Sequence, residues 1–84
     1  MNRPPHTPLT SRQREILAFE ARFWRDAGAK EQALRDELGM TETGYYQALA
    51  RLLDEPAALE HSPALVNRLR RARDRRRGWR TATD

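Results

Sequence analysis

Hydrophobic residues recur every three or four positions through most of this chain, which is the spacing of amphipathic helices rather than of strands. Between residues 10 and 28 they form two adjoining stripes. One stripe comprises Ile16, Phe19, Phe23 and Ala27, and the other comprises Leu17, Ala21 and Trp24. Thr10 and Gln13 have the spacing of a capping box, and Gly28 is a residue type that commonly follows a helix end. The pattern therefore predicts a first helix between Thr10 and Gly28.

Two further helices are predicted in the middle of the chain. Residues 30–38 form a short helix that ends at Gly39, and Thr41 then caps a third helix that ends before Pro56. The buried face of the third helix comprises Tyr45, Ala48, Leu49, Leu52 and Leu53. Leu59 is expected to pack within the connection that follows.

The fourth helix is predicted to begin at Ser62 and Pro63, because an N-cap residue followed by proline favours a helix start. It runs to about Arg77, with Gly78 just past its end. The residues that share one arc of this helix, at about 100° per residue, are Leu65, Val66, Leu69, Ala72 and Arg76. Because this arc changes from apolar to charged, the helix is expected to leave the core after about Ala72.

No strand pattern or internal repeat competes with these helices, so the predicted fold is all-α. The sequence indicates a small four-helix domain at residues 10–77 whose last helix is basic. Residues 1–9, with three prolines among them, are predicted to be a disordered arm. Residues 78–84 are predicted to be a flexible tail.

The helix that ends at Gly39 and the capped helix after it have the arrangement of a helix-turn-helix. Gly39 tolerates the positive φ that the turn needs. The apolar residues expected to fix the angle between the two helices are Leu34, Leu38, Met40, Tyr45 and Ala48. The stretch LGMTETGYYQALARL resembles the recognition half of many bacterial helix-turn-helix domains, including the promoter-reading domain of sigma factors. Arg35 departs from that pattern, because such motifs usually have a small residue there. An ordinary helical hairpin is the structural alternative.

The outer face of the predicted third helix is the part that would enter a major groove. The candidate DNA contacts on this helix are Thr41, Thr43, Gly44, Tyr46, Gln47 and Arg51. Gln47 can read adenine, Thr43 can contact either base or a thymine methyl group, and Tyr46 suits a phosphate. Gly44 would let the backbone approach DNA closely, although a glycine here is equally explained as a weak point in a helix.

Charge is distributed unevenly along the chain. Residues 1–63 carry a formal charge of −2 and residues 64–84 carry +6, which points to a polyanion, most simply a nucleic acid. The candidate contacts to the DNA backbone are Lys30, Arg35, Arg68, Arg70, Arg71, Arg73, Arg75, Arg76, Arg77 and Arg80. Lys30 and Arg35 could equally pair with a nearby carboxylate. For the C-terminal arginines the alternative is a solvated, charged helix end.

Several function classes lack the residues they need. The sequence contains no cysteine, and its two histidines, His6 and His61, belong to no catalytic or metal-binding motif, so we expect neither an enzyme, a metal, a cofactor nor a small-molecule ligand. It also lacks an apolar run of about 18 residues and a secretory signal, which favours a cytoplasmic, nucleoid location without a membrane.

A chain of 84 residues is short for a stable core, and the apolar arc of its first helix is wide. One side of that arc is expected to face the core of the domain and the other a second subunit. The candidate homodimer interface comprises Phe19, Phe23 and Trp24.

Over residues 10–77 the sequence resembles a family of short actinobacterial proteins known as a domain of unknown function. The pieces that carry the resemblance are Gly28-Ala29-Lys30-Glu31, Leu38-Gly39-Met40-Thr41, Tyr45-Tyr46-Gln47 and Leu65-Val66-Asn67-Arg68-Leu69-Arg70-Arg71. Some streptomycete members (Gbn-type) are regarded as nucleoid-associated proteins. The resemblance implies a homodimeric helix-turn-helix protein that binds double-stranded DNA at many chromosomal sites.

Taken together, these features predict a small protein that binds duplex DNA, with its third helix in the major groove and its arginines on the backbone. A nucleoid-associated, architectural role with modest sequence preference and effects on transcription fits the absence of an effector domain. A local transcription regulator is the first alternative. The others are a protein-interaction module that docks on the transcription machinery, with Phe23 and Trp24 as its patch, and an RNA-binding protein.

Overall fold

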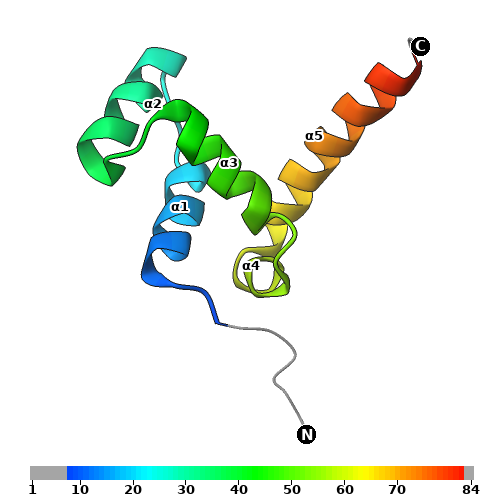
Figure 1. The fold of residues 1–84 in the computed structure, drawn as a ribbon, viewed down its shortest axis with the longest axis horizontal. Coiled ribbons are helices and arrows are strands. Elements are labelled where there is room, and N and C mark those ends of the chain that lie inside the picture. The colour runs from blue at the N-terminus through cyan, green and yellow to red at the C-terminus, as the bar shows by residue number, and fades with distance from the viewer. Residues whose placement is uncertain (1–7, 83–84) are drawn as a thin grey trace, which may run out of the picture.

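The computed structural model describes the backbone of residues 8–82 and the side chains of residues 8–76. Within this part of the chain the helices are α1 (Ser11–Ala21), α2 (Ala27–Ala33), the π-helical turn η1 (Leu34–Leu38), α3 (Glu42–Leu52), α4 (Pro56–His61) and α5 (Pro63–Ala82). The predicted all-α class is confirmed over the described residues. Figure 1 shows α3 crossing in front of α1, while α5 extends away from the other helices on the right.

The start of α1 confirms the predicted capping box. The Thr10 hydroxyl accepts from the Gln13 amide at 3.1 Å, and the Gln13 side chain accepts from the Thr10 amide at 2.8 Å. These two bonds satisfy amide groups that lack partners inside the helix. The helix therefore begins where local sequence places its cap.

The predicted end of the first helix at Gly28 is wrong, because α1 ends at Ala21. Arg22 is extended, and its guanidinium lies 4.4 Å from the centre of the Trp24 ring and donates to Glu37 at 2.6 Å. A continued helix would move the residues after Arg22 and so displace Trp24 from its contact with the guanidinium. Phe23 and Trp24 consequently lie in a loop rather than on the stripes of a helix.

The next helix starts earlier than residue 30. The Asp26 carboxylate accepts from the Ala29 amide at 2.7 Å and caps α2, which continues through η1 to Leu38. Gly39 then adopts a φ of +63°, which confirms the predicted turn. Among the described residues it is the one glycine with positive φ.

Gly39→Ala and Gly28→Ala are expected to change stability in opposite directions. An alanine at position 39 must adopt the left-handed conformation at a cost of about 1 kcal/mol. Gly28 lies inside α2 without positive φ, and an added Cβ there meets its nearest atom at an ordinary 3.4 Å, so alanine should stabilise the helix by up to about 1 kcal/mol. Urea unfolding of both variants measures this difference, and equal shifts would contradict it.

The C-terminal part of the chain contains one helix that the sequence did not predict. Pro56 does not simply end the third helix, because α3 ends at Leu52 and Pro56 occupies the first turn of the additional helix α4. The start of the last helix at Pro63 is confirmed, but α5 continues through Gly78 to Ala82 rather than ending at about Arg77. A glycine inside a helix costs only about 1 kcal/mol, so it need not end one.

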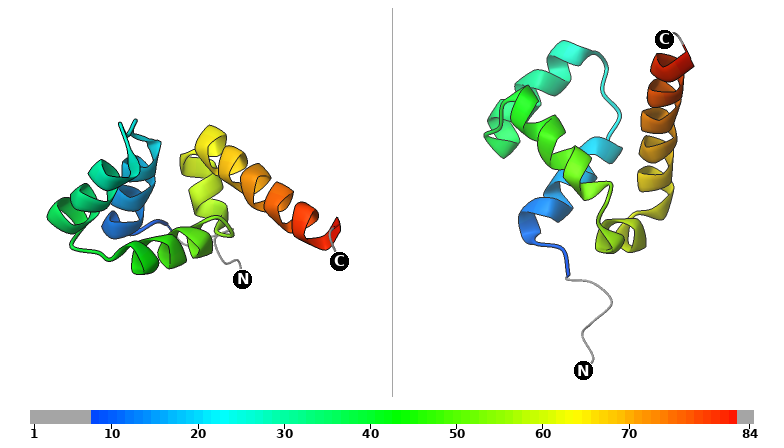
Figure 2. Two further views of the ribbon diagram at one scale, coloured as in Figure 1. Left: turned by 90° about the horizontal axis from the view of Figure 1, so that it is seen from above. Right: turned by 45° about the vertical axis from the view of Figure 1, so that its right-hand side comes forward.

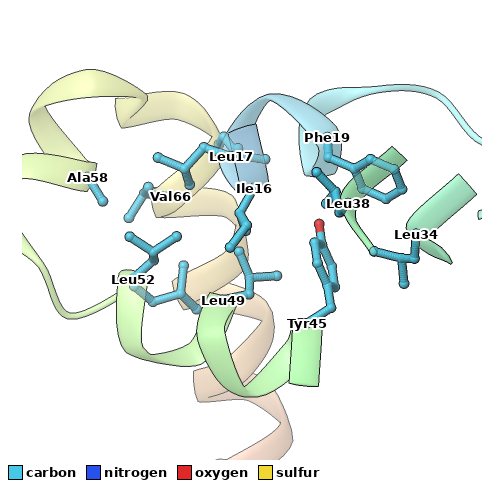
Figure 3. Close-up of a cluster of buried hydrophobic side chains, with 12 residues drawn as sticks. Ile16, Leu17, Phe19, Leu34, Leu38, Tyr45, Leu49, Leu52, Ala58 and Val66 are labelled. Atoms are coloured by element: carbon cyan, nitrogen blue, oxygen red, sulfur yellow. The ribbon is translucent and has the colours of Figure 1, made fainter. Parts of the chain in front are cut away.

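One hydrophobic core joins the helices. Its most deeply buried side chains include Tyr45, Val66 and Ala58 at 0% exposure, and Leu17 and Leu34 at 1%. Figure 3 shows Ile16, Leu49 and Leu52 facing Ala58 and Val66 at one end, and Phe19, Leu34 and Leu38 around Tyr45 at the other. Because α3 contributes to both ends, its position relative to the remaining helices is fixed by the core.

Candidate nucleic-acid interface

The side of α3 that faces away from the core is polar and uncovered. In the left view of Figure 2, α3 lies at the lower edge of the picture, with α1 above it. The exposed residues on and just before this helix include Thr41, Glu42, Thr43, Tyr46, Gln47, Ala50 and Arg51. Apart from Thr41, which caps the helix, all the polar candidates of this helix present side chains to solvent.

Thr41 and Gly44 form a local unit at the start of α3. The Thr41 hydroxyl accepts from the Gly44 amide at 3.1 Å, which confirms the predicted cap. A Cβ added at Gly44 would lie 3.2 Å from that hydroxyl oxygen. The glycine therefore leaves room for the cap, which explains its presence without any contact to DNA.

A polar cluster beneath α3 consists of Glu20 and Lys30, which are partly buried, and Tyr45, which is fully buried. The Glu20 carboxylate accepts from the Tyr45 hydroxyl at 2.6 Å and from the Lys30 ammonium at 2.9 Å. The side chains of Lys30 and Glu20 are only 17% and 12% exposed, and the ammonium also lies 5.1 Å from the centre of the Tyr46 ring. Lys30 thus ties α2 to α1 and α3, which is the carboxylate pairing that the sequence left open.

Lys30 and Tyr45 both keep their protons over the physiological pH range. Burial by itself lowers the pKa of Lys30, but the interactions with Tyr46 and Glu20 outweigh it and raise the pKa above its ordinary value of 10.5. Burial, followed by the hydrogen bond to Glu20, raises the pKa of Tyr45. At neutral pH, Lys30 is therefore charged, and Tyr45 is a neutral donor.

Arg35 is also placed in its alternative role. Its side chain is 61% exposed and pairs with Glu31 at 2.9 Å along the same helical segment. The adjacent Leu34, at 1% exposure, fills the core instead. The departure of Arg35 from the small residue of similar motifs therefore places no charge between the helices.

Two arginines of α5 are attached to the end of α3. Arg70 Nε donates to the Leu53 carbonyl at 2.6 Å, and Arg73 Nη1 lies 3.2 Å from Asp54 Oδ1. Cations are favourable at this end of a helix, where carbonyl groups lack partners inside the helix. Both side chains are partly buried, so Arg70 and Arg73 set the angle of α5 rather than presenting charge to solvent.

Four other arginines of α5 are exposed: Arg68, Arg71, Arg75 and Arg76. Within the described part of the chain, none of the four has an ion pair or hydrogen bond, whereas Arg70 and Arg73 do. The predicted contacts Arg77 and Arg80 have side chains outside the described residues. Val66 is fully buried and Ala72 is partly exposed, so the helix leaves the core about where the sequence predicted.

The three aromatic residues proposed for a dimer interface are separated by the early end of α1. Phe19 is 2% exposed in the core, and Trp24 is half-buried with its ring centre 4.5 Å from that of Phe19. Phe23 alone is open to solvent, at 91% exposure. An interface built on this site has one fully accessible ring rather than three.

Sequence reasoning missed Glu20 and Asp54, which fix the position of α3 and α5. A signal for Glu20 was present, because at helical spacing it lies between the buried residues Ile16 and Leu17 around α1. A carboxylate on such an apolar arc requires a buried partner. No comparable pattern marks Asp54, which follows the last turn of α3.

The described residues hold neither a metal-ligand cluster nor a membrane-spanning helix. No group of three metal-ligating side chains gathers anywhere in this part of the structure. Among the described helices, none combines the length and apolar character needed to span a bilayer.

These features define a small all-α protein whose third helix carries an exposed polar face and whose last helix carries arginines that have no partner among the described residues. Residues 8–81 match the family described as "Protein of unknown function (DUF3263)", and the chain belongs to that family. No curated protein and no solved structure matches it.

Proposed function

We propose that this protein binds double-stranded DNA as a helix-turn-helix protein, with the exposed face of α3 in the major groove. The observation that carries the proposal is the uncovered polar face of a helix that a shared core and the cluster of Glu20, Lys30 and Tyr45 hold in place. The major groove admits one α-helix, and a fixed helix loses little freedom on entering it. Gly39 and the Thr41 cap supply the short turn before it.

The positions of two exposed arginines support phosphate contacts near α3. Arg51 is exposed on α3, and Arg76 lines a groove between α3 and α5. The last turns of α5 extend away from the other helices (Figure 1), and we include Arg77 and Arg80 in the proposed set because they continue the basic sequence after Arg76. Because such contacts carry no sequence information, most of the affinity is expected to be independent of sequence.

This balance favours an architectural, nucleoid-associated role in the cytoplasm with modest effects on transcription. A local regulator of a few genes remains the alternative within the same class. Mapping of chromosomal occupancy distinguishes them, because an architectural protein occupies many sites and a local regulator few.

Thr43→Ala and Gln47→Ala are expected to relax sequence preference. Each variant removes a candidate base contact and should weaken binding to the preferred duplex by about 1–3 kcal/mol, with little change on random duplexes. Selection from random duplexes with the native chain defines the preferred sequence, and titration of the variants on both duplexes measures the change.

Gln32→Ala is the matched control, because Gln32 is an exposed glutamine on α2 whose amide bonds Asp36 at 3.1 Å. It should leave both affinities unchanged. Equal weakening of all sequences by the Thr43 and Gln47 variants would show that α3 is not the reader of base sequence.

A homodimer remains part of the proposal, with Phe23 as its accessible ring. Stable interfaces bury on the order of 1,200–2,000 Å², so Phe23 requires further surface around it. Phe23→Ser should lower the dimer fraction measured by sedimentation equilibrium. Arg25→Ser, which changes an exposed residue in the same loop, should leave that fraction unaltered. A native chain that sediments only as a monomer at tens of micromolar, on the order of 10⁻⁵ M, contradicts the dimer.

A protein-interaction module is the second candidate function, favoured by the exposure of Phe23. An interaction centred on this ring would depend little on salt, whereas binding to DNA depends on it steeply. If the chain binds no duplex at low salt, this second candidate becomes the better account.

A further inference from the structure

Three of the unpaired arginines form a stripe along the outer side of α5. Arg68, Arg71 and Arg75 lie within about 60° of one another around the helix and span about 10 Å along its axis. The face of α5 that contacts the domain comprises Leu65, Val66, Leu69, Arg70, Ala72 and Arg73. The centre of the arginine stripe lies about 150° around the helix from the centre of that face.

The arginine stripe and the exposed face of α3 therefore point in different directions. In the left view of Figure 2, α3 and α4 lie below the start of α5 in the picture, and the contacting face of α5 is the one turned toward them. The stripe lies about 150° around the helix from that face, so it is turned away from α3 and α4. The exposed face of α3 is the side turned away from α1, which lies above α3 in that view.

We infer that the arginine stripe of α5 is a second DNA-binding surface, so that one molecule joins two duplexes. The inference rests on the proposed function of α3. One duplex occupies the exposed face of α3, and a straight duplex held there cannot also follow a stripe that is turned away from α3. The phosphates of a second duplex neutralise Arg68, Arg71 and Arg75 on the other side.

The charge around the stripe favours a polyanion. Asp74 is the one acidic residue among residues 64–76, and it lies nearest to Arg73, with 4.0 Å between Arg73 Nε and its carboxylate. Three close guanidinium groups without counter-charges repel one another until an anion binds. The regular backbone of a duplex supplies several phosphates along such a stripe, and release of their counterions drives the association.

The experiment measures how many duplexes one protein holds. A short biotinylated duplex carrying the preferred sequence is fixed on beads and loaded with protein, and a fluorescent random duplex is then added. Binding of protein to the first duplex tests the proposed function, and capture of the second tests the inference. The native chain should capture the fluorescent duplex.

Combined Arg68→Ser, Arg71→Ser and Arg75→Ser substitutions should preserve loading on the first duplex and reduce capture of the second by about tenfold or more. The single Arg71→Glu substitution should also reduce capture of the second duplex. The matched control changes three exposed arginines away from α5, namely Arg14, Arg25 and Arg35, to serine. This control removes as much positive charge as the stripe variant, and it should capture the second duplex as well as the native chain does.

Each result has a distinct meaning. A native chain that loads on the first duplex without capturing the second overturns the inference and leaves the proposed function intact. Native-like capture by both stripe variants also overturns it, because a dimer would then join the duplexes through two copies of α3. Stronger capture of an RNA hairpin than of the random duplex would make the stripe an RNA site instead. Failure to load on the first duplex refutes the proposed function itself.

Discussion

Raising monovalent salt from about 50 to about 200 mM is expected to weaken binding of the native chain to one duplex by about 150-fold. This value assumes that four arginines meet phosphates of the duplex bound at α3, namely Arg51, Arg76, Arg77 and Arg80. Each neutralised phosphate contributes about −0.9 to the slope of log affinity against log salt, which gives a slope of about −3.6. Fluorescence anisotropy at several salt concentrations measures the slope.

Replacing Arg76, Arg77 and Arg80 together with serine should reduce the slope to about −0.9, since only Arg51 remains of the proposed set. The stripe variant of Arg68, Arg71 and Arg75 is the matched control. It removes the same charge from the same helix but should leave the slope on a single duplex nearly unchanged. An unchanged slope in the first variant would make its arginines a solvated helix end. Circular dichroism of both variants verifies that they remain helical.

Glu20→Gln is expected to lower the free energy of unfolding by about 2–3 kcal/mol. The variant leaves the Lys30 ammonium without its counter-charge at 17% exposure, and it weakens the bond from the Tyr45 hydroxyl. Urea unfolding measures the change. Glu15→Gln on the same helix is the control. Its carboxylate is 59% exposed and lies 3.5 Å from Arg12, so its removal should cost less than about 0.5 kcal/mol. Equal losses in the two variants would contradict a structural role for the polar cluster.

The same cluster predicts the direction of a change with pH. Because the folded state raises the pKa of Lys30, it holds that proton more tightly than the unfolded state does. The stabilisation is therefore fully present below the ordinary pKa of 10.5 and is lost as pH rises through the higher folded value. Unfolding of the native chain should become easier in that alkaline range. Glu20→Gln should reduce this dependence, because it removes the charged partner of Lys30.

The starts of α1, α3 and α5 were the most predictable part of the fold, whereas α2 begins before the predicted residue 30 and α4 was not predicted. The caps at Thr10 and Thr41 each bond an amide three residues along the chain, and Pro63 has a φ that suits a first helical position. Helix ends were less predictable, as the early end of α1 and the continuation of α5 through Gly78 demonstrate. A glycine ends a helix only where the chain requires a positive φ, and among the described residues that happens at Gly39.

The candidate site was likewise predictable from the sequence only in part. Hydrophobic spacing identified the buried face of α3 and, with it, the residues that point outward. It did not identify the roles of the basic residues, since Lys30, Arg35, Arg70 and Arg73 look alike in sequence and have carboxylate or carbonyl partners in the structure. An arginine is available to a phosphate only if no closer acceptor exists, and that depends on the neighbouring helices.

The sequence by itself determined the all-α class, the starts of α1, α3 and α5, the turn at Gly39 and the excess of positive charge near the C-terminus. These properties depend on periodicity, on composition and on bonds between residues three or four apart. Only the tertiary structure decided that α1 ends at Ala21 and that Lys30 pairs with Glu20. It also decided that Arg70 and Arg73 of α5 pair with the end of α3 while other arginines of that helix are exposed. The physical reason is distance along the chain. Glu37, Glu20 and Leu53 lie 15, 10 and 17 residues from Arg22, Lys30 and Arg70, and packing of the core brings each pair together.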